Sequence, residues 1–168
     1  MYWTKRHVVI CTASHCVSRG GQDVAGRLRL EIIRRKLDSE ILINNCGTID
    51  LCDVGPNLVV YPDNVILSNV TLKDVARVAD YLAGGDVPAD LVLDRKTPKE
   101  EQRRGLYAEA SGTDPMDEAT FSALVTRHAL DDKWTADQLK RGFIARKPDV
   151  DGVLRISVTS KARTRYGV

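Results

Sequence analysis

One alternation of apolar and amphipathic segments near the start of the chain most constrains what it can fold into. Residues 7–12 (His-Val-Val-Ile-Cys-Thr) are short and rich in β-branched side chains, which predicts a buried strand. Between residues 22 and 37, apolar side chains recur at helical intervals with arginines between them, which predicts an amphipathic helix. Residues 41–43 (Ile-Leu-Ile) predict the next strand. A strand–helix–strand succession of this kind builds a sheet with helices packed against it.

Two more strands and a second helix extend this pattern. Residues 57–61 (Asn-Leu-Val-Val-Tyr) and 65–67 (Val-Ile-Leu) are mostly apolar and are separated by Pro-Asp-Asn, which predicts a hairpin with a tight turn. Thr71 is a predicted N-cap for a helix, and Gly84 with Gly85 is predicted to end it. The expected fold class is therefore α/β, with a β-α-β-β-β-α domain over residues 1–90.

The second half of the chain has a weaker pattern. Residues 91–115 are expected to form a linker, in which the charged residues 97–104 are either a short helix or extended chain. Residues 116–168 predict a small α+β extension with basic character, and its last part resembles the wing and closing strand of a winged-helix domain, with Ala162 where such domains often have glycine. The expected elements of the extension are helices at 118–128 and 135–141, strands at 143–146 and 153–158, and a turn at 148–152.

Charge and hydropathy narrow the possible classes of protein. The net charge of +2 is too small to mark the whole chain as a nucleic-acid or membrane binder, but residues 140–168 carry +6 and the remainder −4. This asymmetry predicts two functional surfaces. The apolar runs are strand-sized and far shorter than a membrane span, and no apolar leader precedes the first strand, so a cytoplasmic protein is expected.

Four cysteines in the first third of the chain are the candidate functional residues. They form two close pairs, and each is predicted to lie at the end of a strand or in the loop after one. Because the carboxyl ends of adjacent parallel strands meet at one sheet edge, the two pairs are expected to come together. The four are Cys11, Cys16, Cys46 and Cys52.

Four neighbouring thiols allow several chemistries. Structural disulfides are unusual in the cytoplasm, and a dithiol oxidoreductase would use a Cys-x-x-Cys motif that this chain lacks. Zinc binds four thiolates but favours pairs two to four residues apart, whereas iron–sulfur clusters accept wider and unequal spacing. Four buried cysteines without metal are a further alternative. The residues alone leave these possibilities open.

The segment around these cysteines resembles a known family. The motifs are His7-Val-Val-Ile-Cys-Thr with Cys16, then Asn45-Cys46, then Cys52-Asp-Val-Gly-Pro-Asn-Leu-Val-Val-Tyr-Pro, and finally Gly84-Gly85. Over residues 6–86 the chain is similar to the thioredoxin-like 2Fe–2S ferredoxins, which include the Shethna-type ferredoxin and the small flavin-partner subunit of NADH dehydrogenases. The resemblance implies a thioredoxin-like fold, a 2Fe–2S cluster, one-electron transfer and a homodimer.

The resemblance also implies a ligand set, with one departure from the family pattern. Cys11 and Cys16 match the first Cys-x4-Cys pair, and Cys52 matches the fourth ligand. The family usually has its third cysteine four residues before the fourth, at the position of Thr48 here, whereas this chain has Cys46. Cys46 is expected to ligate, because the chain has no other cysteine and Gly47 lets the loop bend.

The implied function is an electron carrier between a reductase and an oxidoreductase, and not an enzyme. Motifs for phosphate binding, serine hydrolysis and zinc-dependent proteolysis are missing, and the three histidines are scattered. His15, beside Cys16, is an alternative ligand of the Rieske type or a solvated loop residue. Two other functions remain as alternatives: a redox-sensing regulator that binds DNA through its basic end, and an accessory subunit with zinc or no metal.

Overall fold

The computed structural model describes residues 3–168, and the first two residues of the expected 1–90 domain lie outside the described part. The chain divides into two compact units, Met1–Leu93 and Asp94–Val168. We call them the N-terminal unit and the C-terminal unit. The boundary falls inside the expected linker, residues 91–115, most of which form the helix α4 (Pro98–Gly112). Pro98 stands in the first turn of α4, a position that favours proline.

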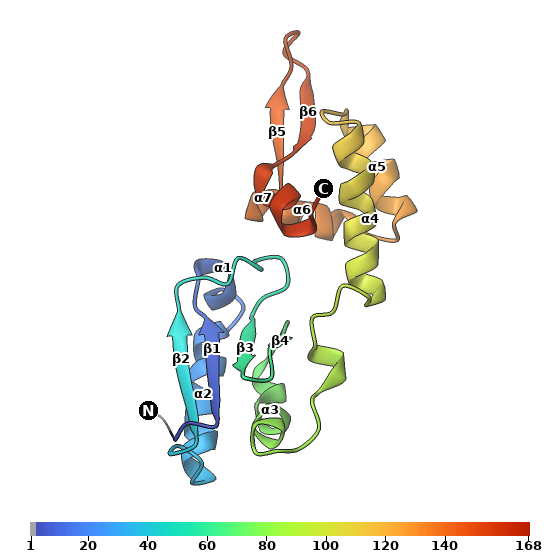
Figure 1. Ribbon diagram of the computed structural model, residues 1–168. Helices are drawn as coiled ribbons and strands as arrows, with labels where there is room; N and C mark the ends of the chain where they lie inside the picture. The colour runs from blue at the N-terminus through green and yellow to red at the C-terminus, as the bar shows by residue number, and fades with distance from the viewer. Residues whose placement is uncertain (1–2) are drawn as a thin grey trace. The chain divides into compact units, whose positions relative to one another are not determined.

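The N-terminal unit contains a four-stranded mixed sheet in the order β2-β1-β3-β4 (Figure 1). The central strand β1 pairs in parallel with β2, and antiparallel with β3, which in turn pairs antiparallel with β4. The strands are β1 (Arg6–Cys11), β2 (Ile41–Cys46), β3 (Leu58–Tyr61) and β4 (Val65–Leu67). The mixed α/β sheet confirms the expected fold class.

Helices α2 (Gly21–Arg34) and α3 (Val75–Leu82) pack on one face of this sheet. Alternate side chains of the strands, such as Val8 and Ile10 in β1, point into the core. A short helix, α1 (Ser14–Val17), precedes α2. The strongly apolar inner faces of both helices explain why the sequence pattern predicted them.

The second helix begins in a tighter turn than the sequence suggested. Residues Leu72–Asp74 form a 3-10 turn, η1, before α3. The Asp74 carboxylate accepts hydrogen bonds from the backbone N–H and the hydroxyl of Thr71, at 2.8 and 2.7 Å. Thr71 therefore marks the start as predicted. Gly84 has a φ of 108°, a left-handed conformation that follows the end of the helix.

The C-terminal unit contains three helices, a β-hairpin and a final short helix. Its core includes an aromatic cluster in which the rings of Tyr107 and Tyr166 stack with centroids 4.6 Å apart. Phe143 is fully buried and Trp134 lies 5.9 Å from Tyr107, so both side chains belong to this core. After α4, the elements are α5 (Glu118–Arg127), α6 (Asp132–Arg141), β5 (Ile144–Pro148), β6 (Leu154–Val158) and α7 (Ser160–Tyr166).

Candidate metal centre

The carboxyl ends of the two parallel strands bring the first and third cysteines together. Cys11 is the last residue of β1 and lies opposite Cys46, the last residue of β2, in the parallel register. Thr12 links the ends of the two strands, because its N–H and its hydroxyl both donate to the Cys46 carbonyl oxygen at 2.9 Å. Cys46 was expected in the loop after the strand, but β2 extends three residues further and carries it to the strand end.

Cys16 occupies the short helix α1 rather than the loop expected from the sequence. Its thiol is hydrogen-bonded to the Cys11 thiol, and the backbone N–H of Asn57 also donates to it. Burial, the Cys11 hydrogen bond and the neighbouring Cys11 and Cys52 charges raise the pKa of Cys16 to about 12, although the Asn57 N–H opposes the shift. Burial, followed by the charge of Cys11, also raises the pKa of Cys46. Cys16 thus interacts with Cys11 and Cys52, and Cys46 interacts with Cys11.

Two glycines leave room for Cys16. A Cβ on Gly55 would lie 2.6 Å from the Cys16 sulfur, and a Cβ on Gly21 would lie 2.8 Å from the Cys16 carbonyl oxygen. No side chain fits at either position without displacing Cys16. By contrast, a Cβ on Gly20 or Gly47 would meet no atom within 4 Å.

Asn57 contacts the segments that carry three of the cysteines. Its carbonyl oxygen accepts the Cys11 N–H at 3.0 Å, and its N–H donates to the Cys16 sulfur. Its side-chain amide donates to the Leu51 carbonyl oxygen, directly before Cys52, at 2.7 Å. The residue is fully buried, and its Oδ1 has no hydrogen-bond partner.

Arg19 forms hydrogen bonds with the loop that follows Cys52. Its guanidinium donates to the carbonyl oxygens of Asp53 and Gly55, at 3.4 and 3.1 Å. This contact joins the end of α1 to the segment that passes over the Cys16 sulfur. Sequence reasoning missed both Arg19 and Asn57. For Asn57 a signal was present, because an amide just before a fully apolar strand implies a buried polar contact.

The two aspartates that flank Cys52 in the sequence differ in exposure. Asp50 is exposed, whereas Asp53 is only 5% exposed. His15 lies on α1 beside Cys16 and is partly buried. Of the four thiols, those of Cys11, Cys16 and Cys52 belong to buried residues, and Cys46 is partly exposed.

The donor set fits a binuclear iron–sulfur cluster. All four cysteines are free thiols, as a cluster requires. Within residues 3–168, no three His, Cys, Asp or Glu side chains are placed around one common metal position. A 2Fe–2S cluster divides its four thiolates between two irons, so its ligands need not converge on a single point.

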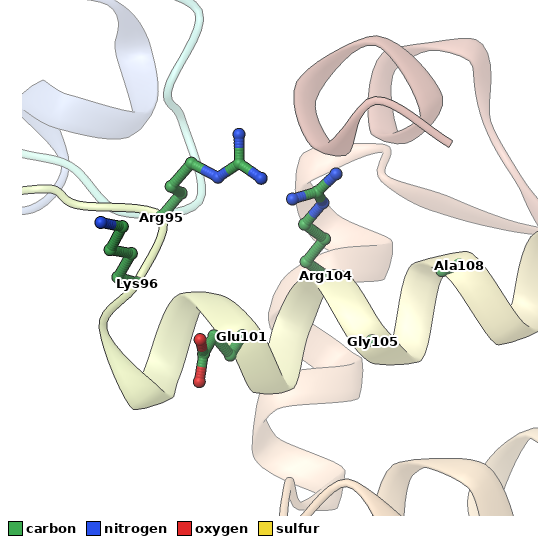
Figure 2. Close-up of a pocket in the computed structure, with 6 residues that line it drawn as sticks. All are labelled: Arg95, Lys96, Glu101, Arg104, Gly105 and Ala108. Atoms are coloured by element: carbon green, nitrogen blue, oxygen red, sulfur yellow. The ribbon is translucent and has the colours of Figure 1, made fainter.

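A cavity of about 470 Å³ lies in the C-terminal unit, away from these residues in the sequence. Arg95, Lys96, Glu101 and Arg104 line it, and Figure 2 shows the guanidinium groups of Arg95 and Arg104 extending into the same space. No cysteine lines this cavity, so it is not part of the thiol site.

The structure defines an α/β protein with four free thiols, two of which lie at the carboxyl ends of adjacent parallel strands. The chain is 32% identical over 92 residues to a 2Fe–2S ferredoxin of Clostridium pasteurianum, a match that covers 49% of this chain and 90% of the relative. It therefore belongs to the 2Fe–2S ferredoxin family. No family model matches the chain.

Aquifex aeolicus provides a further relative and a solved structure. Its 2Fe–2S ferredoxin is 28% identical over 103 residues, covering 55% of this chain and 93% of the relative. The crystal structure of the wild-type thioredoxin-like [2Fe-2S] ferredoxin from that organism superposes with a TM-score of 0.51 at 28% identity, covering 54% of this chain and 98% of that chain. The thioredoxin-like fold expected from the sequence motifs is confirmed.

Proposed function

We propose that this protein is a one-electron carrier that holds a 2Fe–2S cluster through Cys11, Cys16, Cys46 and Cys52. The observation that supports the proposal is that Cys11 and Cys46 lie opposite each other at the ends of β1 and β2, with Cys16 hydrogen-bonded to Cys11, in the fold shared with 2Fe–2S ferredoxins. When bound, such a cluster accepts and releases a single electron. The relatives of this protein are ferredoxins. We therefore assign it electron transfer and not bond-making catalysis.

The chain's own residues control access and charge at this site. Burial of Cys11, Cys16 and Cys52 excludes water from most of the donor set. The Asn57 N–H is a donor to the Cys16 sulfur, and donors of this kind stabilise negative charge on ligating sulfur. Cys46, the partly exposed member, gives electrons their shortest route to the surface.

The partners that fit this activity are a reductase and an acceptor oxidoreductase. The four reduced thiols suit the cytoplasm, where disulfides rarely persist. No helix among residues 3–168 has the length and apolar character to cross a bilayer. The resemblance to dimeric ferredoxins supports a homodimer, and α2 exposes Leu30 and Ile33 one turn apart, an apolar surface that a second copy would cover. Sedimentation that shows only monomer at high protein concentration would exclude the dimer.

The test of the cluster is metal analysis of anaerobically purified full-length protein. We expect about two irons and two sulfides per chain, visible absorption that bleaches with dithionite, and an electron paramagnetic resonance signal from the reduced protein. One zinc per chain, or four free thiols after reconstitution with iron and sulfide, would contradict the proposal.

A further inference from the structure

The C-terminal unit has the element order of a winged helix. Beyond the hairpin of β5 and β6, Met116 forms an antiparallel bridge with Ile156, with N–H to oxygen distances of 3.0 and 2.7 Å in the two directions. Met116 therefore adds a third, minimal strand beside β6. The order along the chain is helix, bridge, helix, helix, strand, turn and strand.

Helices α5 and α6 form a helix-turn-helix. Residues 128–131 connect them, and Ala129 has a φ of 53° in this turn. The Leu130 N–H donates to the Val125 carbonyl oxygen at 3.0 Å, and the Asp131 carboxylate accepts the Trp134 N–H at 2.7 Å. A short turn with both helix ends satisfied fixes the second helix relative to the first.

The two faces of α6 differ in character. Gln138 and Arg141 are buried, and the Gln138 side chain accepts a hydrogen bond from the Tyr107 hydroxyl at 3.1 Å. Lys133, Ala136 and Lys140 are exposed. Because residues 133, 136 and 140 follow one side of a helix, α6 presents a face with two ammonium groups and one small side chain, beside the exposed carboxylate of Asp132 in its first turn.

Most of the basic charge at the end of the chain is already paired. Arg141, Arg146, Arg155, Arg163 and Arg165 each form an ion pair with an acidic residue of the same unit. Among the described residues, Lys133, Lys140 and the exposed Lys147 of β5 form no ion pair. Between the starts of α5 and β6, the unpaired positive charge thus lies on α6 and on β5, while Arg95 and Arg104, earlier in the unit, are also without an ion pair among the described residues.

The turn between β5 and β6 is rigid and exposed. The Asp149 carboxylate accepts the N–H groups of Asp151 and Val153, both at 2.9 Å, and pairs with Arg155 at 3.0 Å. Val150 at the tip is fully exposed. This hydrogen-bonded turn, with the Val150 side chain exposed at its tip, has the form of a wing that can lie along a groove of duplex DNA.

We propose that α6 and the β5–β6 hairpin form a docking surface for duplex DNA. The three unpaired lysines supply the charge complementary to phosphate groups, and a helix with one outward face fits the width of the major groove. This activity is separate from electron transfer and does not depend on the ligand assignment at the thiols.

The test is binding of the full-length protein to a labelled random 30-base-pair duplex, followed by fluorescence anisotropy across a salt series. Three phosphate contacts predict that log K falls with log salt with a slope of about −2.7. The double variant Lys133→Gln/Lys140→Gln should bind more weakly and flatten the slope by about 1.8. Both side chains are exposed, so the melting temperature should not change.

A matched control removes the same charge elsewhere in the unit. Arg95→Gln/Arg104→Gln alters two exposed arginines that form no ion pair among the described residues and that line the cavity of Figure 2. We expect the control to retain wild-type affinity and slope. No binding by the wild-type protein at low salt would overturn the proposal, and so would an equal loss in the two double variants, because charge attraction alone would then explain the binding.

Discussion

Single residues decide how closely the chain can approach the thiols. Gly55 is the clearest case, because its missing side chain leaves the space that the Cys16 sulfur occupies. Asn57 forms hydrogen bonds nearby through both its backbone and its side-chain amide. Arg19 donates to the Gly55 carbonyl oxygen in the same loop. The geometry of the site thus depends on residues that are not themselves ligands.

Gly55→Ala should disturb the site without altering any cysteine. The added Cβ would lie 2.6 Å from the Cys16 sulfur, so the loop or the thiol must shift, at a cost of about 1–3 kcal/mol in the free energy of unfolding. Denaturant unfolding and iron content after reconstitution both measure this effect. Gly47→Ala is the control, since its Cβ would meet no atom within 4 Å. Equal behaviour of the two variants would contradict the close approach.

Cys46→Ala tests the ligand that departs from the family spacing. We expect iron content to fall well below two per chain and the visible absorption to disappear, because no other cysteine can replace Cys46. Alanine is the better choice, since a serine oxygen can still bind iron. Thr48→Ala, at the usual family position, should retain the cluster. If Thr48→Ala loses the cluster and Cys46→Ala keeps it, the assignment is wrong.

At the scale of elements, one polar network joins the first strand, the hairpin turn and the last helix of the N-terminal unit. The Arg6 guanidinium pairs with Asp63 at 3.1 Å and donates to the carbonyl oxygens of Tyr81 and Leu82, at 3.0 and 2.7 Å. The Tyr81 hydroxyl also donates to Asp63. Arg6 therefore satisfies the carboxyl end of α3 while it holds the turn.

This network makes stability depend on acid pH. The Tyr81 hydrogen bond and the Arg6 charge hold the pKa of Asp63 below its ordinary value, despite some desolvation. Because the folded pKa is lower than the unfolded one, the stabilisation is complete above the unfolded value near 4 and is lost as the pH falls through the folded value.

Asp63→Asn should lower the free energy of unfolding at pH 7 by about 1.5–3 kcal/mol, the range for hydrogen bonds to charged groups. It should also reduce the loss of stability below about pH 4. Urea unfolding at a series of pH values measures both effects. Asp86→Asn, at an exposed position outside this network, is the control and should behave as wild type. A wild-type pH profile for Asp63→Asn would contradict the role of the network.

The whole molecule consists of two units with separate cores. The apolar core between the sheet and the helices belongs to the N-terminal unit, and the cluster around Tyr107 and Phe143 belongs to the C-terminal unit. All four cysteines lie in the N-terminal unit. Metal held by these cysteines is therefore expected to stabilise the N-terminal unit directly.

Removal of iron should affect the unfolding transition of one unit and not that of the other in a thermal scan. We expect calorimetry of the iron-loaded protein to show two transitions, one for each unit. In the iron-free protein, only the melting temperature of the N-terminal unit should be lower. Gly55→Ala should lower that same transition. A single transition that moves as a whole on iron removal would contradict the independence of the two cores.

Much of the N-terminal unit could be predicted from the sequence, because strand and helix periodicities and glycine stops act over a few residues. The start of β1, the hairpin turn and Thr71 are examples. For the charged stretch from Thr97, the sequence left a short helix or a linker open. The structure has a helix over residues 98–112, because its few apolar side chains, such as Leu106 and Tyr107, pack in a core assembled from distant residues.

By itself, the sequence determined the α/β class, the four thiols and the two pairs in which they occur. Only the tertiary structure decided that Cys46 stands at the end of β2 opposite Cys11, that Gly55 must lack a side chain, and that Asn57 joins the ligand segments. It also decided that most of the arginines near the end of the chain are paired within their own unit. The physical reason is common to all of these: contacts between residues far apart in the chain depend on how sheets and helices close on each other, and local sequence patterns carry no information about that closure.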